Sequence, residues 1–155
     1  MTPVPLEAAG EREMPYEQNP TGSSEREVTR LAPGDEMPHF RVTTVAGQPF
    51  RYSDVWQRKN LVLIVLPGDD PEAGRRLPDW TGAAARTSGD DTVWVITPDE
   101  VSGVGRPGLV VADKWGEVQF AQSAPTAAGL ARGDELAEWL EFVRYQCPEC
   151  QGEAK

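Results

Sequence analysis

The stretch Leu61-Val62-Leu63-Ile64-Val65-Leu66 decides the fold, because it is an unbroken run of six apolar residues. It is bounded by Asn60 on one side and by the turn residues Pro67 and Gly68 on the other. A run of this length between turn signals is typical of a strand that is buried on both faces. Such a strand lies at the centre of a sheet covered by other elements, so we expect an α/β protein built around 61–66.

Two further apolar segments follow at strand length, Thr92-Val93-Trp94-Val95-Ile96-Thr97 and Gly108-Leu109-Val110-Val111-Ala112. Between the first strand and the second, the sequence favours two short helices, Pro71 to Leu77 and Pro78 to Thr87, because proline is favoured at the first turn of a helix. A strand–helix–strand order predicts a right-handed parallel crossover.

Two hairpins are expected on either side of this unit. Residues 40–45 and 49–52 are rich in Phe, Val, Thr and Tyr and are separated by the turn residues Ala46-Gly47. The late strand 108–112 is followed by the turn signal Asp113-Lys114-Trp115-Gly116 and by the alternating residues 118–120. Together with the crossover, these hairpins predict a mixed sheet.

The clearest helix lies near the C-terminus, where one apolar face recurs at i, i+3, i+4 and i+7: Leu136, Trp139, Leu140 and Val143. Asp134 is the expected N-cap, and the helix is expected to end before Pro148. Among the tryptophans, we expect Trp56, Trp94 and Trp139 in the core and Trp80 and Trp115 nearer the surface. An exposed aromatic pair would indicate a partner surface.

The charge balance excludes several classes of protein. The 155 residues include 15 Lys and Arg against 25 Asp and Glu, a net charge of −10. This charge argues against binding to nucleic acid or to anionic membrane surfaces, because both need clustered cations. A membrane span needs about 20 apolar residues in a row, far more than the sequence offers. No apolar signal-peptide core begins the chain, so we expect a cytoplasmic protein.

The chain divides into three parts. Residues 1–30 contain six Glu and three Arg, with few large apolar residues, so we expect a disordered acidic N-terminal arm. Residues 31–146 are expected to form one domain, and residues 147–155 a short tail that carries a Cys-x-x-Cys motif. Two cysteines cannot form a secreted disulfide scaffold.

Several motifs carry a resemblance to a known family. Residues 33–40 (Pro-Gly-Asp-Glu-Met-Pro-His-Phe) resemble its Gly-Asp-x-x-Pro-x-Phe opening, and residues 47–50 resemble its first hairpin. Residues 109–118 are similar to its late hairpin, which turns at an Asp-x-x-Gly sequence. The chain thus resembles the thioredoxin-like superfamily, in its redoxin or peroxiredoxin-like branch. The resemblance implies a three-layer α/β sandwich, with a mixed central sheet flanked by helices.

The same resemblance implies a place for catalysis that this chain does not fill. In the family, the nucleophilic cysteine follows the central strand, where the N-terminus of the first helix lowers the thiol pKa. Residues 67–75 here contain no cysteine, threonine or serine. Arg106 stands where peroxidases of the family often carry an arginine, and Pro107 where thioredoxins carry a cis-proline. We expect standard peroxidase or thioredoxin chemistry to be absent from the usual site.

Cys147-Pro148-Glu149-Cys150 is the remaining distinctive motif, and three interpretations are open. The pair could cycle between dithiol and disulfide. It could instead supply half of a structural zinc site, which usually needs four ligands and would therefore join two chains in a symmetric dimer. The third interpretation is that both thiols are inert. No other cofactor is expected.

Other candidates are weaker. His39 could act as a general base, but no local partner is placed for it, and a surface histidine is the favoured interpretation. Asp69, Asp70 and Glu72 could bind a hard cation, yet their spacing fits a solvated turn better.

Two functional hypotheses follow, and they leave open whether the chain is an enzyme. The first is a redoxin-like protein that has lost its usual cysteine and acts as a thiol–disulfide oxidoreductase through Cys147 and Cys150. The second is a non-catalytic binding or assembly module of the same fold. The expected partner is a protein or a thiol reductant, and the expected state is a monomer or a homodimer.

Overall fold

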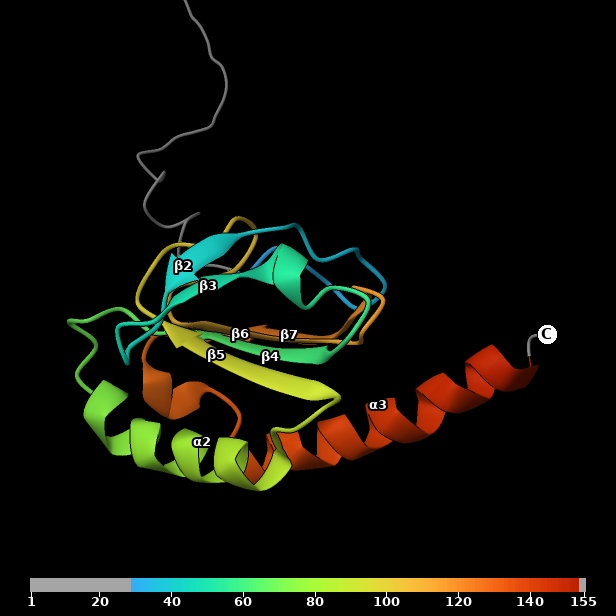
Figure 1. Cartoon of the computed structure of the whole chain (residues 1–155). Helices are drawn as coiled ribbons and strands as arrows, with labels where there is room; N and C mark the ends of the chain where they lie inside the picture. Colours follow the sequence, from blue (N-terminus) through green and yellow to red (C-terminus); the bar gives the residue numbers. More distant parts are fainter. Residues whose placement is uncertain (1–28, 154–155) are drawn as a thin grey trace, which may run out of the picture.

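A four-stranded mixed sheet forms the centre of the molecule (Figure 1). The computed structural model describes the backbone of residues 29–153 and the side chains of residues 29–143, so the expected arm lies almost wholly outside the described residues. The strands are β4 (Asn60–Val65), β5 (Thr92–Thr97), β6 (Gly108–Ala112) and β7 (Val118–Ser123). Their order in the sheet is β5-β4-β6-β7.

Strand β4 occupies the centre that its apolar run predicts. It pairs in parallel with β5 and antiparallel with β6, and β6 pairs antiparallel with β7. All six residues of β4 are buried, because side chains cover both faces of the sheet. The parallel crossover and the late hairpin are therefore confirmed, and with them the mixed sheet.

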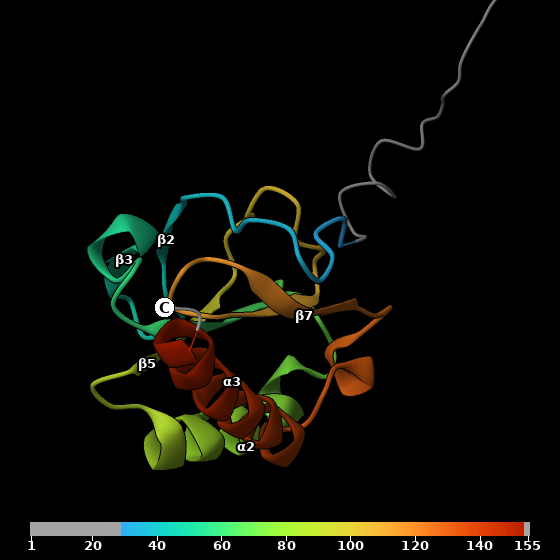
Figure 2. The same cartoon turned by 90° about the vertical axis from the view of Figure 1, so that its right-hand side faces the viewer.

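One face of the sheet is covered by a hairpin and loops. Strand β2 (Arg41–Thr43) pairs antiparallel with β3 (Pro49–Arg51), as expected, and the short 3-10 helix η2 (Tyr52–Asp54) follows. Gly47 adopts a φ of 84° in the turn between the two strands, a conformation that glycine tolerates without strain. Figure 2 shows the hairpin on the opposite side of the sheet from the two long helices.

Both long helices, α2 (Ala73–Thr87) and α3 (Gly133–Glu153), pack on the other face. The expected α/β fold, a mixed sheet with helices packed against it, is confirmed, and both long helices lie on the same face of the sheet. The two short helices predicted for 71–87 are one continuous helix with Pro78 inside it. Proline removes one backbone hydrogen bond, but Trp80 and Ala83 are fully buried on the same helix, and their packing holds it together.

Helix α3 differs from its prediction at both ends. It begins at Gly133, and the backbone N–H of Leu136 donates to the carbonyl of Arg132 at 3.0 Å, so Asp134 lies inside the first turn rather than at the N-cap. The helix continues through Pro148 to Glu153 instead of ending before the proline. A helix can absorb one internal proline by giving up a single hydrogen bond. Neither this helix nor any other in the described part is long and apolar enough to cross a bilayer.

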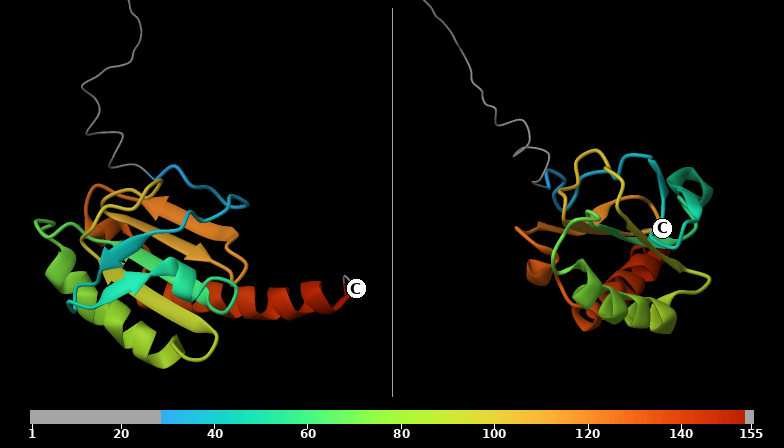
Figure 3. Two further views of the ribbon diagram at one scale, coloured as in Figure 1. Left: turned by 45° about the horizontal axis from the view of Figure 1, so that its top comes forward. Right: turned by 90° about the vertical axis from the view of Figure 1, so that its left-hand side faces the viewer.

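The C-terminal turns of α3 extend past the end of the sheet (Figures 1 and 3). The helix packs on the sheet through Leu136, Leu140 and Val143, all of which are fully buried. The turns beyond this apolar face carry the Cys-x-x-Cys motif. The motif therefore lies on the projecting part of this helix.

A strip of chain at the start of the described region runs along the outer edge of β7. The N–H of Gly34 donates to the carbonyl of Val118, and the N–H of Val118 donates to the carbonyl of Asp35, both at 2.8 Å. Farther along, the Thr29 hydroxyl donates to the carbonyl of Gln122 at 2.9 Å. An uncovered edge strand invites pairing with another chain, and this strip occupies much of that edge.

The tryptophans divide differently from the prediction. Trp80 of α2 is fully buried rather than near the surface. Its indole N–H donates to the carbonyl of Ala131 at 2.9 Å, so the polar atom of the buried ring has a partner. Trp115 is 42% exposed, as expected. Trp56, Trp94 and Trp139 are half-buried and pack at the borders of the core.

Candidate functional site

The loop between β4 and α2 is held by the carboxylate of Asp70. Its oxygens accept hydrogen bonds from the backbone N–H of Glu72 at 2.8 Å and from that of Ala127 at 3.0 and 3.2 Å. Ala127 opens the short helix η3 (Ala127–Gly129), far away in the sequence. Asp70 is therefore a structural tie between two loops, and not the purely solvated turn residue that the sequence suggested.

Arg76 adds a second tie between α2 and η3. Its guanidinium donates to the carbonyls of Ala127 and Ala128 at 3.0 Å and to that of Ala131 at 3.1 Å. The same group lies 4.9 Å from the ring centre of Trp80, a cation–π distance. The hydrogen bonds of this side chain thus hold the η3 loop, and its guanidinium also pairs with Asp79 of α2 at 3.8 Å.

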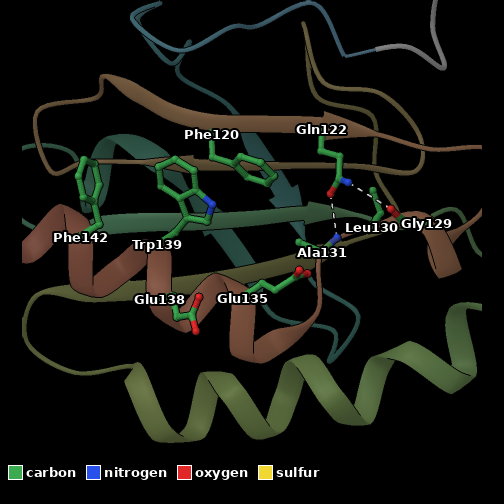
Figure 4. Close-up of a pocket in the computed structure, with 9 residues that line it drawn as sticks. All are labelled: Phe120, Gln122, Gly129, Leu130, Ala131, Glu135, Glu138, Trp139 and Phe142. Carbon is green, nitrogen blue, oxygen red and sulfur yellow. Dashed lines mark hydrogen bonds between the residues drawn. The ribbon is translucent and has the colours of Figure 1, made fainter.

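A hollow of ligand size lies elsewhere, between β7 and α3 (Figure 4). We call it the β7–α3 groove, and it has a volume of about 600 Å³. It is lined by Phe120 and Gln122 of β7, by Gly129, Leu130 and Ala131 of the preceding loop, and by Glu135, Glu138, Trp139 and Phe142 of α3. That volume lies within the range of about 300–1,000 Å³ of ligand pockets.

Three aromatic rings form one wall of the groove. Phe120 stacks on Trp139 with ring centres 5.1 Å apart, and Trp139 meets Phe142 edge-on at 5.7 Å. Phe142 is 51% exposed at the end of this row. The three rings therefore present aromatic surface to solvent, and two of them, Phe120 and Trp139, also pack against the core.

A glutamine fixes the opposite end of the groove. The Gln122 side chain accepts a hydrogen bond from the N–H of Ala131 at 2.8 Å and donates one to the carbonyl of Gly129 at 3.1 Å, as Figure 4 shows. Glu135 accepts from the N–H of Arg132 at 2.8 Å and so closes the first turn of α3. These bonds make the groove a preformed feature of the fold.

Solved structures resemble this chain in architecture. A thioredoxin-family thiol:disulfide interchange protein from Chlorobium tepidum TLS superposes with a TM-score of 0.51 and 16% identity, over 72% of this chain and 97% of that one. A thiol:disulfide interchange protein from Bacteroides sp. gives 0.54 and 14%, over 74% and 91%.

The chain has a thioredoxin-like fold. A thiol peroxidase from Chromobacterium violaceum is also similar, with a TM-score of 0.42 and 14% identity over 77% of this chain and 92% of that one. The sequence matches no protein-family model and no curated protein. At these identities the likeness concerns the scaffold, and function must be argued from the site.

In a thioredoxin-like fold of the resembling branch, the cysteine is expected where β4 leads into α2. That place holds residues 67–72 here, with no cysteine among them. Across from it, the Arg106–Pro107 peptide bond is cis, at the position matched by the sequence resemblance. The Arg106 guanidinium donates to the carbonyl of Pro98 at 2.9 Å, while its buried Nε has no partner in the described part of the chain.

The other residues that the sequence singled out are not brought together at the loop between β4 and α2. His39 is exposed, and its ring meets Trp56 edge-on at 4.9 Å, so the interpretation as a surface histidine is confirmed. Within residues 29–143, no three His, Cys, Asp or Glu side chains come together as a metal site. Cys147 and Cys150 lie on α3, and their side chains are outside the described part.

Sequence reasoning missed the groove, although one signal for it exists. Phe142 is an apolar residue that does not belong to the buried helical face of Leu136, Trp139, Leu140 and Val143. A large aromatic residue outside the buried face of an amphipathic helix indicates either a second packing surface or a site of contact. Phe120 gives no comparable signal, because its place in the late hairpin only predicts a strand residue.

Proposed function

We propose that this chain is a non-catalytic thioredoxin-fold module that binds a protein partner. The observation that carries the proposal is the state of the loop between β4 and α2. The loop has no cysteine, and its carboxylate Asp70 and the nearby Arg76 are engaged in holding η3. The place that serves thiol chemistry in the resembling family supports the framework here.

The chemistry of the loop also disfavours a thiolate supplied from elsewhere. Thiol–disulfide exchange needs a thiolate, which positive charge stabilises and negative charge destabilises. Asp69, Asp70 and Glu72 stand just before α2, and within the described part of the chain Glu72 pairs with Arg75 at 3.6 Å. A visiting thiol would meet an acidic surface at this helix start.

The β7–α3 groove supports the binding half of the proposal. Aromatic side chains are enriched where proteins meet partners, and exposed apolar patches rimmed by polar residues mark interaction sites. The groove combines three aromatic rings with a polar end fixed by Gln122.

Disulfide reduction and peroxide reduction test the absence of catalysis. The full chain and its Cys147→Ser/Cys150→Ser variant are compared in reducing insulin with dithiothreitol and in consuming hydrogen peroxide. We expect both proteins to match the protein-free rate, with an active thioredoxin as the positive control. Turnover by the wild type that the double variant loses would contradict the proposal and favour an oxidoreductase acting through the cysteine pair.

A second candidate function concerns those cysteines, and one observation favours it. Cys147 and Cys150 are three residues apart on a helix, and residues at that spacing lie on the same face. This part of α3 extends past the sheet, where a second chain has room to approach (Figure 3). Two chains meeting there would supply the four thiolates of a structural zinc site.

Native mass spectrometry with metal analysis tests that candidate. A zinc clasp gives a dimer with about half a zinc per chain, because such a site takes four ligands. The dimer would be lost in Cys147→Ser. A loss of two hydrogens that reductant reverses would point to a redox pair instead, and a metal-free monomer with free thiols would contradict both roles.

A further inference from the structure

The β7–α3 groove has a consistent sign of charge. Glu135 and Glu138 line it and are exposed, while no Lys or Arg among residues 29–143 lines it. The nearest basic residue in sequence, Arg132, pairs with Asp134 at 3.2 Å. Residues 133–153 of the same helix contain six Asp and Glu against a single Arg. The groove is therefore aromatic within and acidic along its α3 side.

We propose that the groove binds a basic segment of a partner protein, in which Lys or Arg alternates with apolar residues. This inference rests on the proposed function as a binding module. The cationic heads would lie against Glu135 and Glu138 and over the faces of Trp139 and Phe142, where cation–π attraction adds to ion pairing. The apolar residues of the segment would cover the exposed ring of Phe142.

A hydrogen-bond donor in the groove suits a peptide ligand. Within the described part of the chain, no group accepts from the indole N–H of Trp139. Figure 4 shows this nitrogen on the side of the ring that faces along the groove. A backbone carbonyl of a bound segment would satisfy it, as buried or half-buried indoles usually require.

The charge of each possible occupant shows which of them fits the β7–α3 groove. The chain's own residues 1–30 hold six Glu against three Arg, so they carry the same sign as the groove. A second copy presenting its own α3 would also bring like charge, and phosphate-rich ligands such as nucleic acid are repelled in the same way. A basic protein segment is the occupant whose charge complements the surface.

The test is a titration of the full, ¹⁵N-labelled chain, followed by NMR, with a blocked heptapeptide of sequence Lys-Leu-Lys-Leu-Lys-Leu-Lys. The control peptide carries Glu in place of Lys. We expect the basic peptide alone to shift the Trp139 indole signal and the backbone amides of Gln122 and Ala131. Absence of shifts, shifts on another face, or equal shifts with the acidic peptide would overturn the inference.

Matched variants on α3 distinguish binding in the groove from a general attraction between the peptide and an acidic helix. Glu138 lines the groove and Glu141 does not, although both are exposed. We expect Glu138→Gln to weaken the peptide about two- to fivefold, the usual size of one exposed ion pair, and Glu141→Gln to have less than about half that effect. Phe142→Ser, at an exposed position, should weaken binding by at least about threefold.

Equal effects of Glu138→Gln and Glu141→Gln, or an unchanged affinity in Phe142→Ser, would overturn the inference. The outcome is separable from that of the proposed function. Absent peptide binding with absent thiol turnover overturns only the basic-segment inference, whereas cysteine-dependent turnover overturns the non-catalytic assignment whatever the peptide does.

Discussion

Asp70 shows how one side chain can tie two loops together at the place where β4 leads into α2. Its carboxylate accepts hydrogen bonds from the N–H groups of Glu72 and Ala127. Ala127 is fully buried, so its N–H has no access to water as an alternative partner. The position is therefore structural, and its removal should cost stability and not activity.

We expect Asp70→Ala to lower the free energy of unfolding by about 1–3 kcal/mol, the range for leaving buried donors unsatisfied. The measurement is urea denaturation of the full chain followed by tryptophan fluorescence. Asp69→Ala is the matched control, because Asp69 is exposed in the same loop, and it should change stability by less than about 0.5 kcal/mol. Equal effects at the two positions would contradict the structural role of Asp70.

The environment of Tyr52 leads to a specific prediction about how stability depends on pH. It is fully buried, and its hydroxyl has no hydrogen-bond partner among the described residues. Burial, with smaller contributions from Asp113 and Glu36, raises the pKa of Tyr52 from 10.0 to about 12. Between those values the unfolded chain binds fewer protons than the folded chain, so the stability that Tyr52 contributes is lost as the pH rises from about 10 to 12.

Tyr52→Phe should therefore change the stability at pH 7 by less than about 1 kcal/mol, because it removes an unsatisfied hydroxyl without creating a cavity. It should also flatten the fall in unfolding free energy between pH 10 and 12. Denaturation curves of the wild type and the variant across that range check both statements. A large loss at pH 7 would show that the hydroxyl has a partner.

At the level of elements, the contact between α2 and α3 depends on Gly133. A Cβ at this position would lie 2.8 Å from the Cβ of Ala83 and 2.8 Å from the carbonyl oxygen of Asp79. The Asp79 carboxylate also accepts a hydrogen bond from the N–H of Gly133 at 2.7 Å. The backbone at the start of α3 therefore lies directly against a side chain of α2. Such a close approach leaves no room for a larger residue.

Gly133→Ala should lower the free energy of unfolding by about 1–3 kcal/mol, as overpacking of a tight contact does. Gly82→Ala is the comparison within α2, because the nearest atom to its added Cβ is a flexible arginine end at 3.7 Å. That variant should raise stability by about 0.5–1 kcal/mol through helix propensity. Thermal unfolding of both variants decides the matter, and a stabilising Gly133→Ala would contradict the packing described.

Elements differ in how well the sequence predicts them. The strands β4, β5 and β6 follow from runs of buried apolar residues, and the hairpin turns follow from their glycines. The helix boundaries do not follow from the sequence, because Pro78 and Pro148 each predict the end of a helix when only neighbouring residues are considered. Burial of Trp80 and Ala83 beyond Pro78 overrides that local preference, and no window of sequence contains the contacts responsible.

Across the whole molecule, the candidate site was the part least accessible from sequence. The β7–α3 groove joins residues of β7, the loop before α3, and α3 itself, and its shape depends on the Gln122 bonds to Gly129 and Ala131. The sequence did predict the missing cysteine after β4 and the motif at Cys147 and Cys150. It could not predict that an aromatic, acidic surface stands next to the late hairpin.

The most direct measurement is the affinity of the basic heptapeptide for the wild type and for Cys147→Ser/Cys150→Ser, each under reducing conditions. We assign recognition to the groove and none of it to the cysteines. We therefore expect both proteins to bind with the same Kd and to show the same shifts at Trp139. Binding that disappears with the cysteines, or that neither protein shows, would contradict this assignment.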